Sequence, residues 1–211
     1  MKHIYAGFIV PSAPVIPVGV GICKRLYRKA GLDIILYYLV FAMTINITER
    51  FIGQRHINNL PLLHFYTLLE GILILGYFKI VLNQCFKKLI KVLCTIFILF
   101  TLIDLALLNS IYEFNSYARS VGAFFIIICC VLHLYDGGLN ERWINNPFYW
   151  ITAGMLLYFT SSLIYFGLLN FIAAHATDFM WYLIQNIHAS LVLSMYILIT
   201  AGFVRTSVKS E

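Results

Sequence analysis

The stretch that decides the fold runs from Pro61 to Leu82 and reads PLLHFYTLLEGILILGYFKIVL. It is long enough to cross a bilayer as an α-helix, which needs about 20 mostly apolar residues. One acidic residue, Glu70, stands near its middle. An ionisable group at that depth is costly to insert and usually faces the interior of a helix bundle. The stretch therefore predicts a spanning helix that packs against other helices along one face.

Six further stretches have a similar length and apolar character. Together with the first they predict an all-α, seven-helix transmembrane bundle, with helices at Ile4–Cys23, Ile34–Ile52, Pro61–Leu82, Leu89–Asn109, Ser116–Tyr135, Pro147–Leu169 and Phe179–Phe203. The connections are too short to hold a soluble domain, so residues 1–211 are expected to form a single transmembrane domain. Three prolines interrupt the first stretch, which we interpret as a kinked helix that is retained and not as a signal peptide.

The composition agrees with an integral membrane protein. Of the 211 residues, 61% are hydrophobic and 11% are charged, and the mean hydropathy is +0.85. A soluble domain carries about 25% charged residues, so this chain has too few charges to cover a water-facing surface. The net charge of +6 lies in short basic clusters between apolar stretches. This pattern is typical of membrane topology and does not indicate a nucleic-acid partner.

The basic residues predict the orientation in the membrane. The loops that follow the first, third, fifth and seventh helices hold eleven of them, namely Lys24, Arg25, Arg28, Lys29, Lys79, Lys87, Lys88, Lys91, Arg142, Arg205 and Lys209. The other side holds four, Lys2, Arg50, Arg55 and Arg119. The positive-inside rule assigns the larger group to the cytoplasm. We therefore expect the N-terminus outside and the C-terminus in the cytoplasm.

Polar and ionisable residues gather in the outer halves of the predicted helices, whereas the inner halves are almost wholly apolar. In the third helix, Tyr66, Thr67 and Glu70 share one face because of their spacing. Since polar residues on separate helices fall at similar depths, we expect them to converge in a pocket that opens outward between the second, third, fourth and seventh helices. Its expected lining is Tyr66, Thr67, Glu70, Asp104, Gln185 and His188, with His64, Glu49, Arg50 and Arg119 nearer the mouth.

The two arginines at the mouth indicate what such a pocket could bind. Arg50 and Arg119 are natural counter-ions for the nearby carboxylates. If these groups converge, the pocket carries both signs of charge, and an arginine could hold a zwitterionic or anionic headgroup.

Three functions fit this pocket. The first is binding or sensing of a small or lipid-like ligand that enters from outside or from the outer leaflet. The alternative is an intramembrane hydrolase that acts on a lipid-like substrate, either with or without a metal ion. The metal-dependent form would need His64, Glu70, Asp104 and His188 to converge at metal-ligand distances, and the chain contains no H-x-x-x-H or H-E-x-x-H motif. The third is a small-molecule transporter, which would need a second polar cavity on the inner side.

The sequence identifies no catalytic residue, no set of metal ligands and no cofactor. The expected partners are membrane lipids, a small-molecule or lipid ligand, and a cytoplasmic signalling protein that the basic inner loops could contact. An oligomer is compatible with these features, and the sequence does not specify one.

Three motifs carry a resemblance to a known family. They are NNLPLLHFYTLLE at 58–70, FNSYARS at 114–120, and PFYW at 147–150 followed by LYFTS at 157–161. These motifs resemble segments of an uncharacterised family of small, seven-helix bacterial membrane proteins, and the similarity covers most of the chain. The resemblance implies a multi-pass protein of the cell inner membrane, and it assigns no role to any residue.

Overall fold

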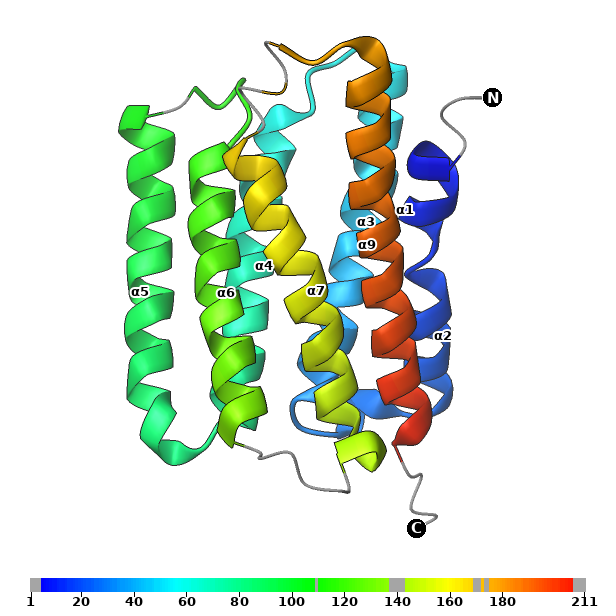
Figure 1. Cartoon of the computed structure of the whole chain (residues 1–211), viewed down its shortest axis with the longest axis vertical. Helices are drawn as coiled ribbons and strands as arrows, with labels where there is room; N and C mark the ends of the chain where they lie inside the picture. The colour runs from blue at the N-terminus through cyan, green and yellow to red at the C-terminus, as the bar shows by residue number, and fades with distance from the viewer. Residues whose placement is uncertain (1–4, 109, 137–142, 169–171, 173–174, 207–211) are drawn as a thin grey trace.

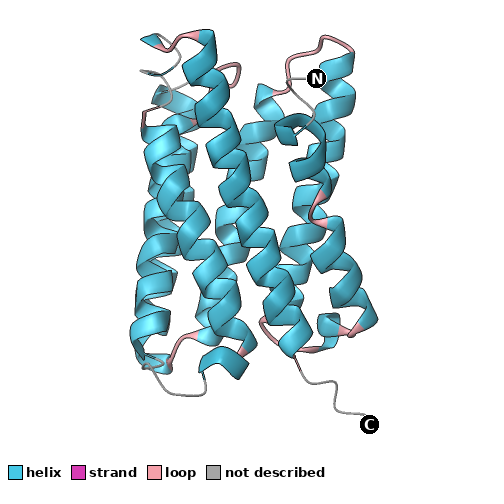
Figure 2. Ribbon diagram, turned by 45° about the vertical axis from the view of Figure 1, so that its right-hand side comes forward, coloured by secondary structure: helices cyan, strands magenta, loops and turns pink. Residues whose placement is uncertain are grey.

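Seven helical segments cross the structure from end to end (Figure 1). The structure is a computed structural model that describes residues 5–108, 110–136, 143–168, 172 and 175–206. All seven segments are long and apolar enough to span a membrane, and no strand occurs among the described residues (Figure 2). The chain is therefore an all-helical, multi-pass integral membrane protein, as its sequence predicts.

The observed spans begin and end within a few residues of the predicted ones. The first span combines the π-helical turn η1 (Tyr5–Ile9), α1 (Val10–Ser12) and α2 (Val15–Cys23). The others are α3 (Leu32–Gln54), α4 (Leu60–Val81), α5 (Lys87–Ile103) with the π-helical turn η4 (Asp104–Leu108), α6 (Ser116–Asp136), α7 (Pro147–Gly167) and α9 (Asp178–Arg205). The 3-10 turns η2 (Leu26–Arg28), η3 (Gln84–Phe86) and η5 (Trp143–Asn145) lie in the connections.

The helices run alternately up and down in chain order. We call the end at which the first span begins, at the top of Figure 1, the upper end, and the opposite end the lower end. Helices α6, α7 and α9 pack side by side in sequence, and α4 packs against α3 and α6. Helix α5 contacts α4 and α6 at one edge of the bundle, and the first span contacts α9 at the other edge (Figure 1).

The helix of the first span is interrupted at its prolines, where the sequence predicts a kink. Ala13 and Pro14 separate α1 from α2, because a proline has no N–H to donate within the helix. The upper part is held by a 2.9 Å hydrogen bond between the hydroxyls of Tyr5 and Ser190. At the lower end, the Lys24 ammonium donates to the carbonyl oxygens of Val204 and Thr206. A cation at this position also balances the partial negative charge at the C-terminal end of α9.

Helices α7 and α9 cross closely in the lower half of the bundle. A Cβ atom on Gly202 would lie 2.7 Å from the carbonyl oxygen of Pro147, and one on Gly154 would lie 3.0 Å from Cβ of Leu198. Small residues of this kind let two membrane helices approach along their backbones. Above the crossing the two helices diverge toward the upper end (Figure 1).

Apolar side chains fill the lower half of the bundle. The buried core there comprises Leu32, Ile35, Leu39, Ile74, Leu75, Tyr77, Phe78 and Phe203.

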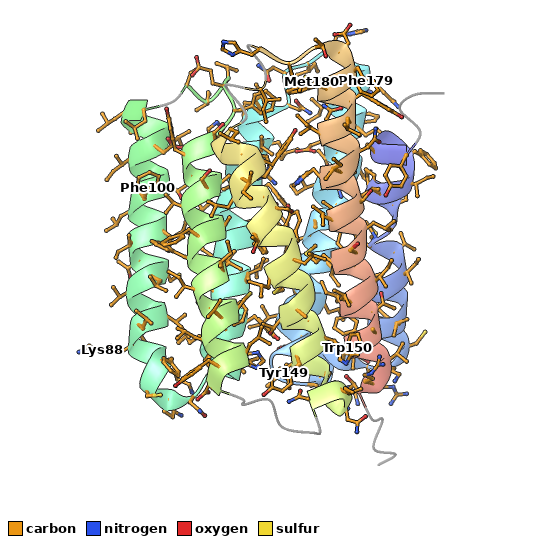
Figure 3. All side chains as sticks on the ribbon, in the orientation of Figure 1. Lys88, Phe100, Tyr149, Trp150, Phe179 and Met180 are labelled. Atoms are coloured by element: carbon orange, nitrogen blue, oxygen red, sulfur yellow. The ribbon has the colours of Figure 1, made fainter. Side chains whose placement is uncertain are left out.

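Aromatic and basic residues lie at the lower end itself. Tyr149 and Trp150 are found there, and Lys88 projects outward from α5 (Figure 3). The Arg205 guanidinium stands 4.1 Å from the Trp150 ring. Tryptophan and basic residues in this arrangement are typical of a membrane–water interface.

The close crossing gives a first prediction. We expect Gly202→Val to lower the free energy of unfolding by about 1–3 kcal/mol, because the new side chain must push the α7 backbone away. Gly76→Val is the matched control, since a Cβ on Gly76 meets nothing within 4 Å. Unfolding in detergent, followed by circular dichroism, measures both. Equal stability of the two variants would show that the crossing is not tight.

Candidate functional site

A cavity of about 450 Å³ opens in the upper half of the bundle. Cavities that bind small molecules commonly measure about 300–1,000 Å³. The first span, α3, α4, α6, α7 and α9 all contribute to its wall, with the residues Ala6, Gly7, Val10, Pro11, Ile45, Asn46, Glu49, Leu63, Tyr66, Arg119, Tyr158, Tyr165, Phe166, Gln185, His188, Ala189, Val192 and Tyr196. We call this space the upper cavity.

Arg119 of α6 is held between aromatic rings at the wall of the upper cavity. Its guanidinium carbon lies 4.2 Å from the Phe166 ring centroid and 5.5 Å from the Tyr66 ring centroid. The hydroxyl of Tyr158 lies beside the same guanidinium. Cation–π contacts of this kind contribute about 0.5–2 kcal/mol each. Two ring faces and one hydroxyl do not use all five N–H donors of an arginine, so Arg119 can still bind an anion.

Glu70 lies behind this arginine and fixes its aromatic neighbour. Its carboxylate oxygen Oε1 accepts a 2.7 Å hydrogen bond from the hydroxyl of Tyr66 and a 3.1 Å bond from that of Tyr38. Glu70 is buried, and it borders a small second void together with Thr67 and Arg119. Both Glu70 and Glu49 attract the guanidinium through space. The carboxylate thus positions Tyr66, and it stabilises the positive charge without lining the upper cavity.

His188 of α9 forms another part of the wall. Its ring stacks on Tyr165, with centroids 4.4 Å apart and planes inclined by 11°. It also contacts the rings of Tyr158 and Phe166. Its Nδ1 atom is buried and has no hydrogen-bond partner within the described residues. Gln185 borders the same cavity one turn above it.

The structure brings together part of the predicted set of residues. Five of them line the upper cavity, namely Glu49, Tyr66, Arg119, Gln185 and His188. Thr67 and Glu70 lie directly behind the wall, at the second void.

The structure places the other three elsewhere. Arg50 donates to the carbonyl oxygen of Gly7, and so fastens the first span. Nε2 of His64 lies 3.0 Å from the carbonyl oxygen of Glu113, and the ring borders a separate groove between α4 and α5. Asp104 is buried on η4. Because α5 packs at the edge of the bundle, on α4 and α6, it does not form the expected wall; the first span, α6 and α7 do.

The sequence reasoning missed the contribution of α7. Tyr158, Tyr165 and Phe166 supply most of the aromatic surface around Arg119 and His188. The signal available was the heptad spacing of Tyr158 and Tyr165, which places both on one face of a helix.

Asn115 is a second residue that sequence reasoning missed. It is buried, and its amide donates a 2.6 Å bond to the Thr67 hydroxyl. This contact fixes the start of α6 against α4. Arg119, one turn further along, is thereby directed at the upper cavity.

A metal-binding arrangement is not found in the part of the chain that the structure describes. No group of three or more His, Cys, Asp or Glu side chains there could hold a metal ion. The convergence of His64, Glu70, Asp104 and His188 that a metal-dependent hydrolase would require does not occur, since these residues lie on the separate surfaces described above.

Comparisons with known proteins add no further assignment. No protein family, no curated protein and no solved structure matches this chain. The resemblance noted in the sequence is thus supported only at the level of a small polytopic membrane protein.

The Glu70 contacts yield a second prediction. We expect Tyr38→Phe to lower the free energy of unfolding by about 1–3 kcal/mol, because the buried carboxylate then loses one of its two phenol donors. Tyr37→Phe is the matched control, since Tyr37 is exposed on the same helix. Detergent unfolding compares the two. If both variants match the wild-type protein, the Tyr38–Glu70 bond does not stabilise the fold.

Proposed function

We propose that this chain is a ligand-binding or ligand-sensing protein of the cell inner membrane, with the upper cavity facing outside. Its ligand is a small or lipid-like molecule with an anionic group that binds Arg119. The observation that supports the proposal is the guanidinium of Arg119, held between Phe166 and Tyr66 at the wall of an open cavity. Arginine suits this role because its planar fork of donors matches a carboxylate or a phosphate.

The remaining wall of the upper cavity favours a ligand with a second polar group. Glu49 and Asn46 come from α3, and Gln185 comes from α9. A cationic or hydrogen-bond-donating group near Glu49 would complement its carboxylate while the anionic group binds Arg119. The ligand that fits best is therefore zwitterionic, or anionic with additional donors.

Binding accounts for the lower half of the bundle better than transport does. A transporter offers its substrate polar groups on both sides of the membrane. Here the helices below the cavity are packed by the apolar core around Leu39, Ile74 and Phe203, which offers a polar ligand no favourable path to the lower end.

A hydrolase that acts on the same ligand is the second candidate, and one observation favours it. The imidazole of His188 borders the cavity. A histidine at the wall of a ligand cavity can serve as a general base. Recovery of intact ligand after prolonged incubation with the protein would support binding alone, whereas cleaved ligand would support the hydrolase.

The third prediction concerns Arg119. We expect the wild-type protein, purified in mild detergent, to retain a molecule with a phosphate or carboxylate group in native mass spectrometry. Arg119→Gln should reduce its occupancy roughly tenfold or more, because a hydrogen bond to a charged group contributes about 1.5–3 kcal/mol. Arg55→Gln is the control, since Arg55 stacks on Phe51 away from the cavity. Equal occupancy in the two variants would contradict the proposed site.

The fourth prediction concerns orientation, which we propose from the basic residues of the lower end. Cys85 is exposed in the lower-end connection between α4 and α5, and Arg55 is exposed at the upper end. In proteins whose other cysteines are replaced by serine, Arg55→Cys should react with a membrane-impermeant maleimide added to intact cells. Cys85 should react only after permeabilisation. The opposite pattern would place the upper cavity toward the cytoplasm.

A further inference from the structure

A second, apolar space lies on the outside of the bundle between α7 and α9. This α7/α9 groove measures about 310 Å³ and is lined by Ile164, Leu168, Ile184, Ile187 and Leu191 together with Tyr165 and His188. Ile164 is 62% exposed and Ile187 is 54% exposed. In a membrane these side chains face the hydrocarbon of the bilayer, so the natural occupant of the groove is an alkyl chain.

The groove and the upper cavity share one wall. Tyr165 and His188 line both spaces, and their rings stack nearly parallel. A single layer of two side chains thus separates a polar cavity from an apolar surface in the membrane. The partition depends on ring stacking, and the buried Nδ1 of His188 adds no hydrogen bond to it within the described residues.

The packing of the helices explains why the partition lies at this level. Gly154 and Gly202 hold α7 and α9 together in the lower half, and the helices diverge above (Figure 1). Tyr165 and His188 occupy the diverging part, where aromatic side chains fill the space between the backbones. A rotation of these side chains would connect the two spaces without separating the glycine crossing.

From these observations we infer that the ligand is a membrane lipid. Its alkyl chain lies in the α7/α9 groove, and its headgroup passes between Tyr165 and His188 into the upper cavity. The headgroup chemistry that fits is a phosphate at Arg119 beside an ammonium near Glu49. This inference rests on the proposed function, since it names the class of ligand for the same cavity and adds the groove as its second half.

The physical argument for a lipid is that it satisfies both spaces at once. A chain in the groove exchanges contacts with lipid for contacts with protein, so it gains packing but little hydrophobic free energy. The charged headgroup provides the specificity, through Arg119 and Glu49. A water-soluble headgroup lacks the chain that concentrates it in the membrane, and should bind more weakly.

Another groove, between α2 and α9, is a second place where an alkyl chain could lie. It is lined by Ile16, Ile197 and Val204 among others, and it shares only Tyr196 with the upper cavity. Tyr196 is buried in the core. The α7/α9 groove is favoured because its shared wall consists of two half-buried side chains.

Three probes in native mass spectrometry of the purified full chain test the inference. They are dioleoyl phosphatidylethanolamine, its headgroup alone (O-phosphoethanolamine), and its chains without the charged headgroup (dioleoylglycerol). We expect the complete lipid to bind at least about tenfold more tightly than either part, a difference of about 1.4 kcal/mol. Failure of the complete lipid to bind the wild-type protein would overturn the inference.

Tryptophan substitutions locate the chain. Ile164→Trp and Ile187→Trp, each made singly, fill the α7/α9 groove and should weaken binding of the complete lipid about tenfold. Ile197→Trp fills the other groove; Ile197 lies on α9, as Ile187 does, and its side chain is 59% exposed. Leu99→Trp alters the lipid-facing side of α5, where Leu99 is 55% exposed. Both controls should bind the lipid as the wild-type protein does. Thermal unfolding of every variant verifies that it is folded. If only one of the two groove variants folds, that variant alone is enough to test the position of the chain.

The outcomes separate the two proposals. If Arg119→Gln abolishes binding but the groove variants bind normally, the upper cavity is the site and the lateral lipid route is wrong. If Ile197→Trp alone weakens binding, the chain lies between α2 and α9, which also overturns the inference. If O-phosphoethanolamine binds as tightly as the lipid, the lipid inference is wrong. The proposed function then stands with a water-soluble ligand. If Arg119→Gln changes no binding, the proposed function itself fails.

Discussion

The cost of placing a guanidinium among membrane helices governs the upper half of this protein. Arg119 is half-buried among the membrane helices, and a charge in such a medium must be stabilised by its neighbours. The chain provides two aromatic faces, one phenol hydroxyl and the fields of two carboxylates. They come from three other helices: α3 provides Glu49, α4 provides Tyr66 and Glu70, and α7 provides Tyr158 and Phe166. Helices α3, α4, α6 and α7 must therefore meet at one level, and together with the first span and α9 they enclose the upper cavity.

Much of the fold could be predicted from the sequence, because the membrane imposes a simple rule on length and composition. The seven spans and the break of the first span at its prolines follow from apolar stretches and the missing N–H of Pro14. The packing order does not follow from these patterns. Nothing in the sequence of α5 indicates that it packs on α4 and α6 at the edge of the bundle. Sequence reasoning therefore predicts Asp104 in the pocket.

The candidate site shows the same limit at the level of single residues. Depth can be counted along a helix, which predicts similar levels for polar residues on separate helices; Tyr66, Gln185 and His188 border one cavity. Rotation about the helix axis depends on the neighbours. His64 and Tyr66 are two residues apart, yet one borders a groove beside α5 and the other supports Arg119. The aromatic wall from α7 was missed because Tyr158 and Tyr165 look like ordinary packing residues in an apolar helix.

The contact between the first and last spans has a consequence for biogenesis. Tyr5 bonds to Ser190 and Lys24 bonds to the end of α9, so the first of the seven spans meets the helix that fastens both its ends only after the five spans between them have been synthesised. Until then the proline-broken first span lies in the membrane without the contacts that fasten its two ends. Because α9 also lines the upper cavity, docking of α9 completes the bundle and the site in a single step of assembly.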